Sequence, residues 1–282
     1  MNISLIAEQL VNEKVISHYP NSVKVLNGGT TSTVYLLDGK YVVKLNESEV
    51  IREEAYFLQF YKSTNMFPEL VYKDPLNRYF VYSFLEGTTS CKPGHKRSIL
   101  CKLVKEVINK YEIVPNANSF GWKESPSHSW TEFLATNVME AHENVSPYIS
   151  NEEYKLVLKL ASSPNRGTGI HRPFLLHGDL GFHNFIFQEN KLKGVIDPLP
   201  VLGDPTYDLI YAFCSTPEDV TKETIQYVMK QCVFHKRDKD LYEEIIIGLY
   251  LRIDRCLRHH PKDLEDYLVA WRYWMDEIDP AL

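Results

Sequence analysis

The sequence predicts an α+β protein of two lobes, in which a small antiparallel β lobe precedes a large, mainly α-helical lobe. Short β-branched and aromatic runs separated by turn residues fill the first part of the chain, whereas apolar residues at helical spacing dominate the remainder. The length of 282 residues and the apolar content of 44% suit a globular protein with room for both lobes. We expect one lobe over residues 1–86 and the other over residues 87–282.

The first lobe is expected to contain two helices and five short strands. Apolar residues at helical spacing predict the helices over 3–18 and 49–61. Asp38-Gly39 is a strong hairpin signal between two β-like runs. The predicted strands cover residues 23–26, 33–37, 41–45, 69–72 and 79–84. Because short turns join most of these strands, we expect an antiparallel sheet.

The second lobe is expected to consist of amphipathic helices. Their predicted ranges are 96–111, 151–161, 219–233, 239–259 and 262–278. Thr216-Pro217-Glu218-Asp219 supports one of these starts, because it combines a hydroxyl cap, an early proline and acidic side chains beside the positive end of the helix dipole. The segment 112–130 is expected to be an ordered loop or insertion. Only 185–188 and 192–196 are β-like in this lobe.

Composition excludes several classes of protein. The net charge of −6 argues against a nucleic-acid binder. No apolar run approaches the roughly 18 residues of a membrane span, and the N-terminus lacks the pattern of a signal peptide. The five cysteines form no CxxC pair, which argues against a disulfide framework or a zinc site. We therefore expect a cytoplasmic monomer or dimer without nucleic-acid or membrane partners.

The negative charge is unevenly distributed. Residues 1–199 contain 21 acidic and 21 basic side chains, whereas residues 200–282 contain 16 acidic and 10 basic ones. A solvated helical surface explains this excess, and a cleft that attracts a cationic substrate is the alternative. Arg252, Arg255 and Arg258 recur at three-residue spacing in the same region. A solvated helix face is our first interpretation of these arginines, and a site for an acidic substrate is the second.

The most informative segment reads Leu-His-Gly-Asp-Leu-Gly-Phe-His-Asn over residues 176–184. Asp179 is followed by Asn184, and Asp197 ends the next apolar run. Kinase-type enzymes place a catalytic Asp and two magnesium ligands at this spacing. Asp179 is therefore the candidate catalytic residue that orients an acceptor hydroxyl, while Asn184 and Asp197 offer the hard oxygen ligands that Mg²⁺ prefers. The motif predicts transfer of the γ-phosphoryl group of a nucleotide to a hydroxyl group.

Three further side chains are expected near this motif. His177 is expected to hold the loop by hydrogen bonds rather than to react, and His183 either contacts the substrate or fills the loop. Asp208 precedes an apolar run and should therefore be buried, where a carboxylate needs hydrogen-bond donors. We predict that Asp208 anchors the loop.

The first lobe carries the candidate nucleotide-binding residues. A turn after the first strand offers hydroxyl and main-chain N–H groups to phosphate, and its candidate residues are Gly28, Gly29, Thr30, Thr31 and Ser32. Lys44 lies in an apolar strand, where an unpaired ammonium is costly, so contact with the α- and β-phosphates is preferred over exposure to solvent. For its acidic partner on the next helix we prefer Glu53, with Glu54 as the alternative. Adenine is expected to bond to the main chain near Ser83 and Leu85.

These motifs together resemble the aminoglycoside phosphotransferase and choline kinase superfamily. In the second lobe the resemblance rests on His-Gly-Asp-Leu-Gly-Phe-His-Asn, Gly-Val-Ile-Asp and Gly-Asp-Pro-Thr-Tyr-Asp-Leu. In the first lobe it rests on Gly-Gly-Thr-Thr-Ser-Thr-Val-Tyr, Val-Val-Lys and Arg-Glu-Glu-Ala. The resemblance extends over residues 20–280 and is weakest over 90–165 and in the last helices. It implies a protein-kinase-like fold and a small-molecule kinase that uses Mg²⁺ and ATP or GTP.

The resemblance also implies roles for single residues. By position, Asp179 resembles the catalytic Asp, Asn184 and Asp197 the metal ligands, and Lys44 with Glu53 the phosphate-anchoring ion pair. The sequence Pro-Leu-Pro directly after Asp197 departs from the family pattern, since two prolines remove N–H groups and stiffen the loop. No Ala-Pro-Glu motif follows. A phosphorylatable activation loop and a protein substrate are therefore not expected.

We expect the acceptor to be a cationic small molecule, and among these we prefer an aminoglycoside antibiotic, which would imply a role in antibiotic resistance. The first alternative is a metabolic kinase of the choline, homoserine, methylthioribose or fructosamine type. The second is a non-catalytic nucleotide-binding module of the same fold. The presence of Asp179 argues against such a module, because nucleotide binding alone does not need a catalytic Asp.

Overall fold

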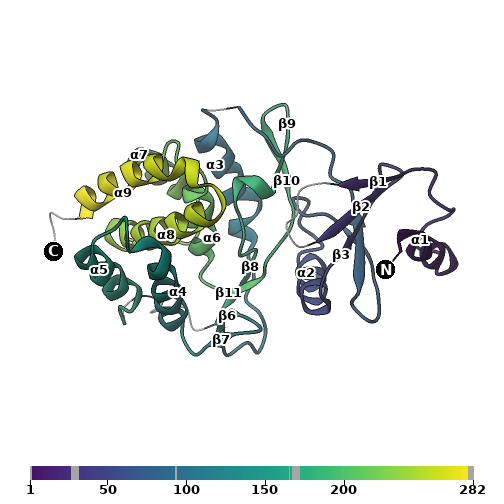
Figure 1. Cartoon of the computed structure of the whole chain (residues 1–282), viewed down its shortest axis with the longest axis horizontal. Coiled ribbons are helices and arrows are strands. Elements are labelled where there is room, and N and C mark those ends of the chain that lie inside the picture. Colours follow the sequence, from purple (N-terminus) through teal and green to yellow (C-terminus); the bar gives the residue numbers. More distant parts are fainter. Residues whose placement is uncertain (1, 27–31, 93, 165, 167–171, 279–282) are drawn as a thin grey trace.

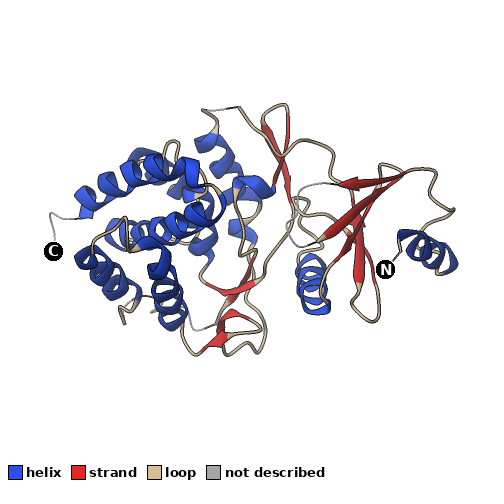
Figure 2. Ribbon diagram, in the orientation of Figure 1, coloured by secondary structure: helices blue, strands red, loops and turns tan. Residues whose placement is uncertain are grey.

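The structure, a computed structural model, describes residues 2–26, 32–92, 94–164, 166 and 172–278. A β-rich lobe lies at the N-terminal end of the molecule, and helices dominate the other end (Figures 1 and 2). This arrangement is the predicted α+β architecture. No helix in the described part of the chain is long and apolar enough to cross a membrane.

The first lobe is built on a five-stranded antiparallel sheet. Its strands are β1 (Val23–Leu26), β2 (Thr33–Leu37), β3 (Tyr41–Leu45), β4 (Leu70–Lys73) and β5 (Tyr79–Ser83), in the spatial order β1-β2-β3-β5-β4. Alternate residues of a strand point to opposite faces. Val42 therefore packs in the core that includes helix α2 (Ser48–Phe60), and Val43 packs in the core that includes α1 (Ile3–Asn12). Lys44 shares the face of Val42 and is directed at α2.

The second lobe consists of helices gathered around one central helix. They are α3 (Lys96–Glu106), α4 (Trp130–Val145), α5 (Asn151–Ala161), α6 (Pro205–Cys214), α7 (Lys222–Met229), α8 (Asp238–His259) and α9 (Leu264–Ile278), with short 3₁₀ turns η1 (Ile108–Lys110), η2 (Phe182–Asn184) and η3 (Pro261–Asp263). The apolar side of α8 is fully buried at Ile245, Ile246 and Leu249. This helix packs against α4, α5, α6 and α9, so residues on α8 are held firmly relative to the rest of the lobe.

At least three predicted helices are shorter than expected, and one of them, predicted over 96–111, ends at Glu106. The first helix of the chain ends at Asn12, and Lys14 beyond it has a φ of 59°, outside the helical region. The helix expected from Asp219 begins instead at Lys222. Asp219 has a φ of 54°, and the main-chain carbonyl groups of Thr216 and Glu218 accept hydrogen bonds from a buried lysine on α3. Those contacts hold the segment in an irregular path and leave Thr221 to cap α7.

Two small sheets frame the motif over residues 176–184. The first was not predicted: it has the order β7-β6-β11-β8 and consists of β6 (Phe120–Trp122), β7 (Pro126–Ser127), β8 (Phe174–Leu176) and β11 (Val201–Gly203). The second is the antiparallel hairpin of β9 (Phe185–Gln188) and β10 (Lys191–Val195), which agrees with the predicted β-like runs. The motif therefore runs from the end of β8 to the start of β9.

The two lobes share buried contacts. One cluster of buried apolar side chains extends from the α2 face of the first sheet into the helical lobe. The hydroxyl of Tyr61, just after α2, donates to the carbonyl of Leu175 in β8 at 2.6 Å and accepts from the N–H of Glu112 at 3.1 Å. Next to the predicted boundary, and within the second lobe, Thr88 exchanges two main-chain hydrogen bonds with Phe187 of β9. The boundary between residues 86 and 87 stays a prediction.

Candidate active site

The loop that follows β8 is held by a buried carboxylate at the start of α6. Asp208 is fully buried and accepts hydrogen bonds from the main-chain N–H groups of His177 and Gly178 at 2.8 and 3.0 Å. The hydroxyl of Tyr111 donates a further hydrogen bond at 2.5 Å. Burial raises the pKa of Asp208 to about 7, although these three donors favour its ionised form. Asp208 therefore lies where a loop-anchoring residue was expected.

Gly178 allows the segment after Asp197 to cross directly over this loop. Its φ is 79°, and a Cβ at this position would lie 1.8 Å from the carbonyl oxygen of Leu199. The N–H of Leu199 donates to the carbonyl of His177 at 2.8 Å. Only glycine fits both the backbone conformation and the space, so the two segments form one tightly packed unit.

His177 is buried inside this unit. Its Nδ1 accepts from the N–H of Asp179 at 3.3 Å, so its Nε2 carries the proton and donates to the carbonyl of Ile196 at 3.0 Å. Burial lowers the pKa of His177 to about 4, so the imidazole is neutral at neutral pH. The rings of Phe57 and Phe67 pack against it at centroid distances of 5.6 and 6.1 Å. His177 thus joins the main chain of Asp179 to that of Ile196, and its role in holding the loop stays a prediction.

Four side chains direct hydrogen-bond donors at the carboxylate of Asp179. Nε2 of His183 lies 3.1 Å and Nδ2 of Asn184 lies 2.9 Å from Oδ2. The hydroxyl of Tyr211 donates to Oδ1, and Nη1 of Arg255 lies 3.4 Å from the same oxygen. Burial alone would raise the pKa of Asp179, but the hydrogen bonds from His183 and Tyr211 and the charge of Arg255 outweigh it and hold the pKa well below its usual value. The carboxylate is therefore ionised at neutral pH.

The two candidate metal ligands lie at the same end of the β9–β10 hairpin. Asn184 precedes β9, Asp197 follows β10, and the N–H of Ile196 donates to the carbonyl of Asn184 at 3.0 Å. Both amide N–H contacts of Asn184 go to Asp179, and its Oδ1 accepts no hydrogen bond from the described residues. Among the described residues, no three His, Cys, Asp or Glu side chains lie close enough together to hold a metal ion by themselves. One carboxylate and one amide oxygen fit Mg²⁺, which keeps several waters and binds nucleotide phosphates.

Lys44 is buried and pairs with Glu54, not with the preferred Glu53. Its Nζ lies 2.8 Å from both carboxylate oxygens of Glu54 and 3.3 Å from Oδ1 of Asp197. Burial lowers the pKa of Lys44, but the two negative charges outweigh burial and raise it overall. Glu53 instead contacts Lys123 at 2.8 Å. The predicted pairing is therefore wrong by one residue, while Lys44 and Asp197 lie together as a phosphate and metal site requires.

The structure describes only some of the remaining candidate nucleotide-binding residues. Gly28, Gly29, Thr30 and Thr31 lie outside the described residues. Ser32 is described, and its hydroxyl accepts from Nδ2 of Asn46 at 2.7 Å. The N–H and hydroxyl of Ser83 are already bonded to the main chain of Glu69. The N–H and C=O of Leu85 have no hydrogen-bond partner within the described ranges, so of Ser83 and Leu85 it is Leu85 whose N–H can still bind a base.

A cavity of about 280 Å³ lies next to Asp179, between α4, α6 and α8. Tyr211 and Arg255, which both contact Asp179, form part of its wall. Apolar side chains, including Trp130 and Ile210, line another part. A small molecule in this cavity would contact Tyr211 and Arg255, the two wall residues that bond Asp179. The cavity is therefore the candidate acceptor site.

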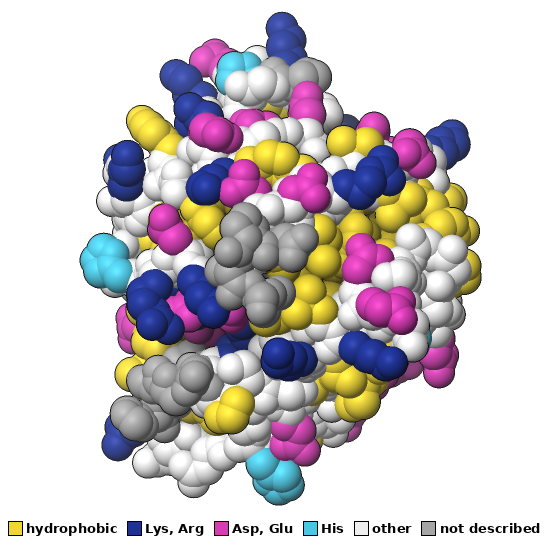
Figure 3. Space-filling view, turned by 90° about the vertical axis from the view of Figure 1, so that its left-hand side faces the viewer, with side chains coloured by type: hydrophobic (Ala, Val, Ile, Leu, Met, Phe, Trp, Pro, Cys, Tyr) yellow, Lys and Arg dark blue, Asp and Glu magenta, His cyan; other side chains and the backbone are white. Residues whose placement is uncertain are grey.

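The charges that line the cavity are mixed. Arg252, Arg255 and Arg258 line it, as do two exposed glutamates on α4, Glu140 and Glu143. The face of the helical lobe seen in Figure 3 also mixes acidic and basic side chains rather than presenting one sign. The negative excess of residues 200–282 is therefore not concentrated at the cavity in the part of the chain that the structure describes.

Tyr211 and Arg255 were not predicted as neighbours of Asp179. Tyr211 follows Asp208 by three residues on α6, and Arg255 is the middle member of the arginine series on α8. The spacing of the arginines was visible in the sequence. Their proximity to Asp179 was not, because it depends on how α8 packs against α6.

Comparison with known proteins supports these assignments of fold and class. The model of the phosphotransferase enzyme family matches residues 22–232. No curated protein matches the chain in sequence. The solved streptomycin–ATP ternary complex of APH(2″)-IIa has a TM-score of 0.60 at 18% identity and covers 98% of this chain and 97% of that one. The GDP complex of aminoglycoside 2′-phosphotransferase-IIIa has a TM-score of 0.62 at 17% identity, and the match covers 98% of this chain and 99% of that one.

A third similar structure is a candidate fructosamine-3-kinase from Thermobifida fusca. Its TM-score is 0.61 at 16% identity, and the match covers 96% of this chain and 100% of that one. All three likenesses extend over almost the full length of both chains. They confirm the predicted bilobal, protein-kinase-like fold.

Proposed function

Because this chain belongs to the phosphotransferase enzyme family, we propose that it transfers the γ-phosphoryl group of ATP or GTP to a hydroxyl group of a small molecule. The chain is a phosphotransferase with an alcohol acceptor. The observation that carries the proposed mechanism is the position of Asp179, which bonds the candidate metal ligand Asn184 on one side and Tyr211 and Arg255, two residues of the cavity wall, on the other.

On the nucleotide side, Lys44 would contact the α- and β-phosphates while Glu54 and Asp197 hold its ammonium group in place. The free main-chain groups of Leu85 would bind the base. Mg²⁺ on Asn184 and Asp197 would neutralise charge on the phosphate oxygens. The amide group of Asn184 also bonds Asp179, so one residue would align the metal site with the catalytic carboxylate.

On the acceptor side, Asp179 would accept a hydrogen bond from the reacting hydroxyl and aim its oxygen at the γ-phosphorus. The low pKa of Asp179 makes it a weak base. A weak base is sufficient here, because phosphoryl transfer depends mainly on positioning and electrostatic stabilisation. His183 and Tyr211 would keep the carboxylate oriented while the acceptor binds.

Two classes of acceptor have support. An aminoglycoside is the first candidate, because similar structures are complexes with streptomycin, gentamicin or kanamycin, and because Glu140 and Glu143 could contact ammonium groups. A metabolic acceptor is the second. Arg252, Arg255 and Arg258 at the cavity favour this second class, since guanidinium groups repel a polycation.

Substitution of Asp179 tests the proposed function. With Mg-ATP and a panel of amino sugars, macrolides, choline and sugar amines, we expect ADP release with at least one acceptor. Asp179→Asn should reduce this turnover by at least about a hundredfold while leaving nucleotide-induced thermal stabilisation intact. Asp197→Ala should remove both turnover and nucleotide-induced stabilisation.

Asp266→Asn is the matched control, because Asp266 is an exposed carboxylate on α9. It should change neither measurement. Full activity of Asp179→Asn would contradict the mechanism. ADP release with none of the acceptors, together with normal nucleotide binding, would favour a non-catalytic nucleotide-binding module instead.

A further inference from the structure

Two half-buried arginines line the cavity and have unused hydrogen-bond donors. Arg252 and Arg255 lie three residues apart on α8, so their side chains are neighbours on one helix face. Nε of Arg252 donates to the hydroxyl of Tyr267 at 2.8 Å, and Nη1 of Arg255 contacts Asp179 and Tyr211. The two Nη atoms of Arg252, and Nε and Nη2 of Arg255, have no acceptor among the described residues.

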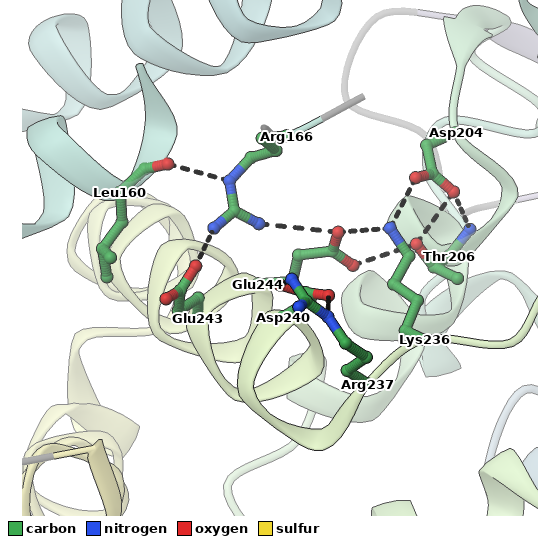
Figure 4. A network of polar contacts seen from close by, with 9 residues as sticks. All are labelled: Leu160, Arg166, Asp204, Thr206, Lys236, Arg237, Asp240, Glu243 and Glu244. Carbon is green, nitrogen blue, oxygen red and sulfur yellow. Dashed lines mark hydrogen bonds and ion pairs between the residues drawn. The ribbon is translucent and has the colours of Figure 1, made fainter. Parts of the chain in front are cut away.

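None of the four carboxylates that line the cavity forms an ion pair with Arg252 or Arg255; Glu140 and Glu143 on α4 have no ion pair among the described residues, and the other two bind different partners. Glu244 lines the cavity, but its oxygens bind Lys236 and the hydroxyl of Thr206, with Arg166 at 3.5 Å (Figure 4). Asp254 bonds Arg258 and Asn144. Within the described part of the chain Arg252 has no ion pair, and Arg255 has an ion-pair contact with Asp179 alone, while the charge of Asp254 acts on Arg255 without such a contact.

We propose that the acceptor carries a carboxylate group, which Arg252 and Arg255 bind in this cavity while its hydroxyl group faces Asp179. This inference rests on the proposed function, and it identifies the chemical class of the substrate. A guanidinium group offers two parallel N–H donors that match a carboxylate. Because the donors in question are half-buried and partly removed from water, the charge-assisted contact would be stronger than one at an exposed surface.

Arg255 would lie between the carboxylate of Asp179 and the carboxylate of the acceptor, so its positive charge would offset the repulsion between them. A carboxylate placed near the ionised Asp179 without a cation would be repelled. Arg255 contacts Asp179 through Nη1 and has its other edge available, so its positive charge would lie between both carboxylates. The apolar wall at Trp130 and Ile210 would contact the carbon chain of the acceptor. A polycationic acceptor, in contrast, would place ammonium groups against two unneutralised arginines.

Matched pairs of acids and amides test the proposal, because each pair differs in charge and keeps its hydroxyl groups. The probes are glycerate, threonate, gluconate and glucuronate, each beside its primary amide, with kanamycin, choline and ribose as acceptors without a carboxylate. ADP release with Mg-ATP gives kcat and KM for each. We expect at least one acid to be a substrate, with kcat/KM at least about tenfold above that of its amide.

Substitutions on α8 separate acceptor binding from effects on Asp179. Arg252 does not touch Asp179, so Arg252→Gln should raise KM for the acid, leave kcat nearly unchanged and bring the acid-to-amide ratio close to one. Arg255→Gln should also lower that ratio, but with a fall in kcat for all acceptors, since it contacts Asp179. Arg272→Gln is the matched control: Arg272 is an exposed arginine on α9 outside the cavity lining and is paired with Glu265, so its loss should leave the ratio unchanged.

A second measurement does not depend on turnover. Phenylglyoxal modifies accessible arginines, and mass spectrometry can quantify its addition to Arg252 and Arg255. We expect the acids to protect these two residues and the amides not to. Equal protection by an acid and its amide, or equal kcat/KM values, would overturn the proposed carboxylate.

The outcomes also distinguish this inference from the proposed function. Turnover of kanamycin, choline or ribose without preference for any acid would overturn the carboxylate and leave the kinase assignment in place. Turnover of none of these acceptors would count against the kinase assignment. Protection of Arg252 and Arg255 by acids alone would in that case still establish a carboxylate-binding cavity.

Discussion

At the scale of the residue, the position of one carboxylate on a helix decides which lysine it neutralises. Glu53 and Glu54 are adjacent, so their side chains leave α2 about 100° apart. Glu54 lies on the side of α2 that is turned toward the sheet, and its carboxylate contacts the ammonium group of Lys44. Glu53 is turned away from Lys44 and contacts Lys123. The sequence predicted that Lys44 needs an acidic partner on this helix. It could not decide between two adjacent glutamates, because the rotation of α2 is set by packing against the sheet.

Paired substitutions of these glutamates should have very different effects. Glu54→Gln leaves the buried ammonium of Lys44 without its main counter-charge, which should cost about 3 kcal/mol of unfolding free energy and weaken nucleotide binding. Glu53→Gln removes ion pairs with Lys123 and Arg52, whose side chains are both about half exposed, and should cost under about 1 kcal/mol. Urea denaturation and titration with ATP measure both effects. Similar losses in the two variants would contradict the assignment of Glu54 as the partner.

At the scale of the element, local sequence patterns predicted structure where partners are close in sequence. The strands around Asp38-Gly39 pair through a short turn, and their bounds agree with the prediction. In contrast, β8 and β11 have three residues each and pair with each other across more than twenty intervening residues. Such short strands carry no periodic pattern of their own. Their structure comes from the loop that they support, so a single sequence could not reveal it.

The crossing of the loop at Gly178 gives a sharp prediction at this scale. Gly178→Ala would force a Cβ to within 1.8 Å of the carbonyl oxygen of Leu199, so the loop or the crossing segment must move. Because small displacements of catalytic groups reduce rates strongly, we expect turnover to fall at least about a hundredfold. Steady-state kinetics and thermal unfolding measure the change in activity and stability.

Gly39→Ala is the matched control for the Gly178 variant. Gly39 also has a positive φ, of 68°, but no atom lies within 4 Å of a Cβ built there. It should cost about 1 kcal/mol through backbone strain alone and leave kcat unchanged. Equal effects of the two substitutions would show that strain, rather than the close crossing, controls the loop.

At the scale of the whole molecule, the two lobes share one apolar core. The buried cluster contains side chains of α2 and of the helical lobe together, and Tyr61 bonds the main chain of Leu175 and Glu112. Removal of either lobe would expose this core to water. The lobes are therefore expected to unfold together rather than one after the other.

Two probes with different locations check this cooperative unfolding. All four tryptophans, Trp122, Trp130, Trp271 and Trp274, lie in the second lobe, so their fluorescence reports that lobe alone. Hydrogen exchange of the amides of β3 and β5 reports the first sheet. We expect the two probes to give the same urea midpoint. Separate midpoints would indicate independent lobes and support the predicted boundary between residues 86 and 87 as a folding boundary.

The short path from Asp197 to β11 has a consequence for how activity can be controlled. After Asp197 the chain crosses over Gly178, bonds His177 through Leu199, and enters a strand that is paired on both sides. A segment held at so many points has no second arrangement into which a modification could release it. A displacement of Asp197 would therefore also disturb His177 and the two strands that pair with β11, so the candidate metal ligand and the loop of Asp179 are expected to move as one unit.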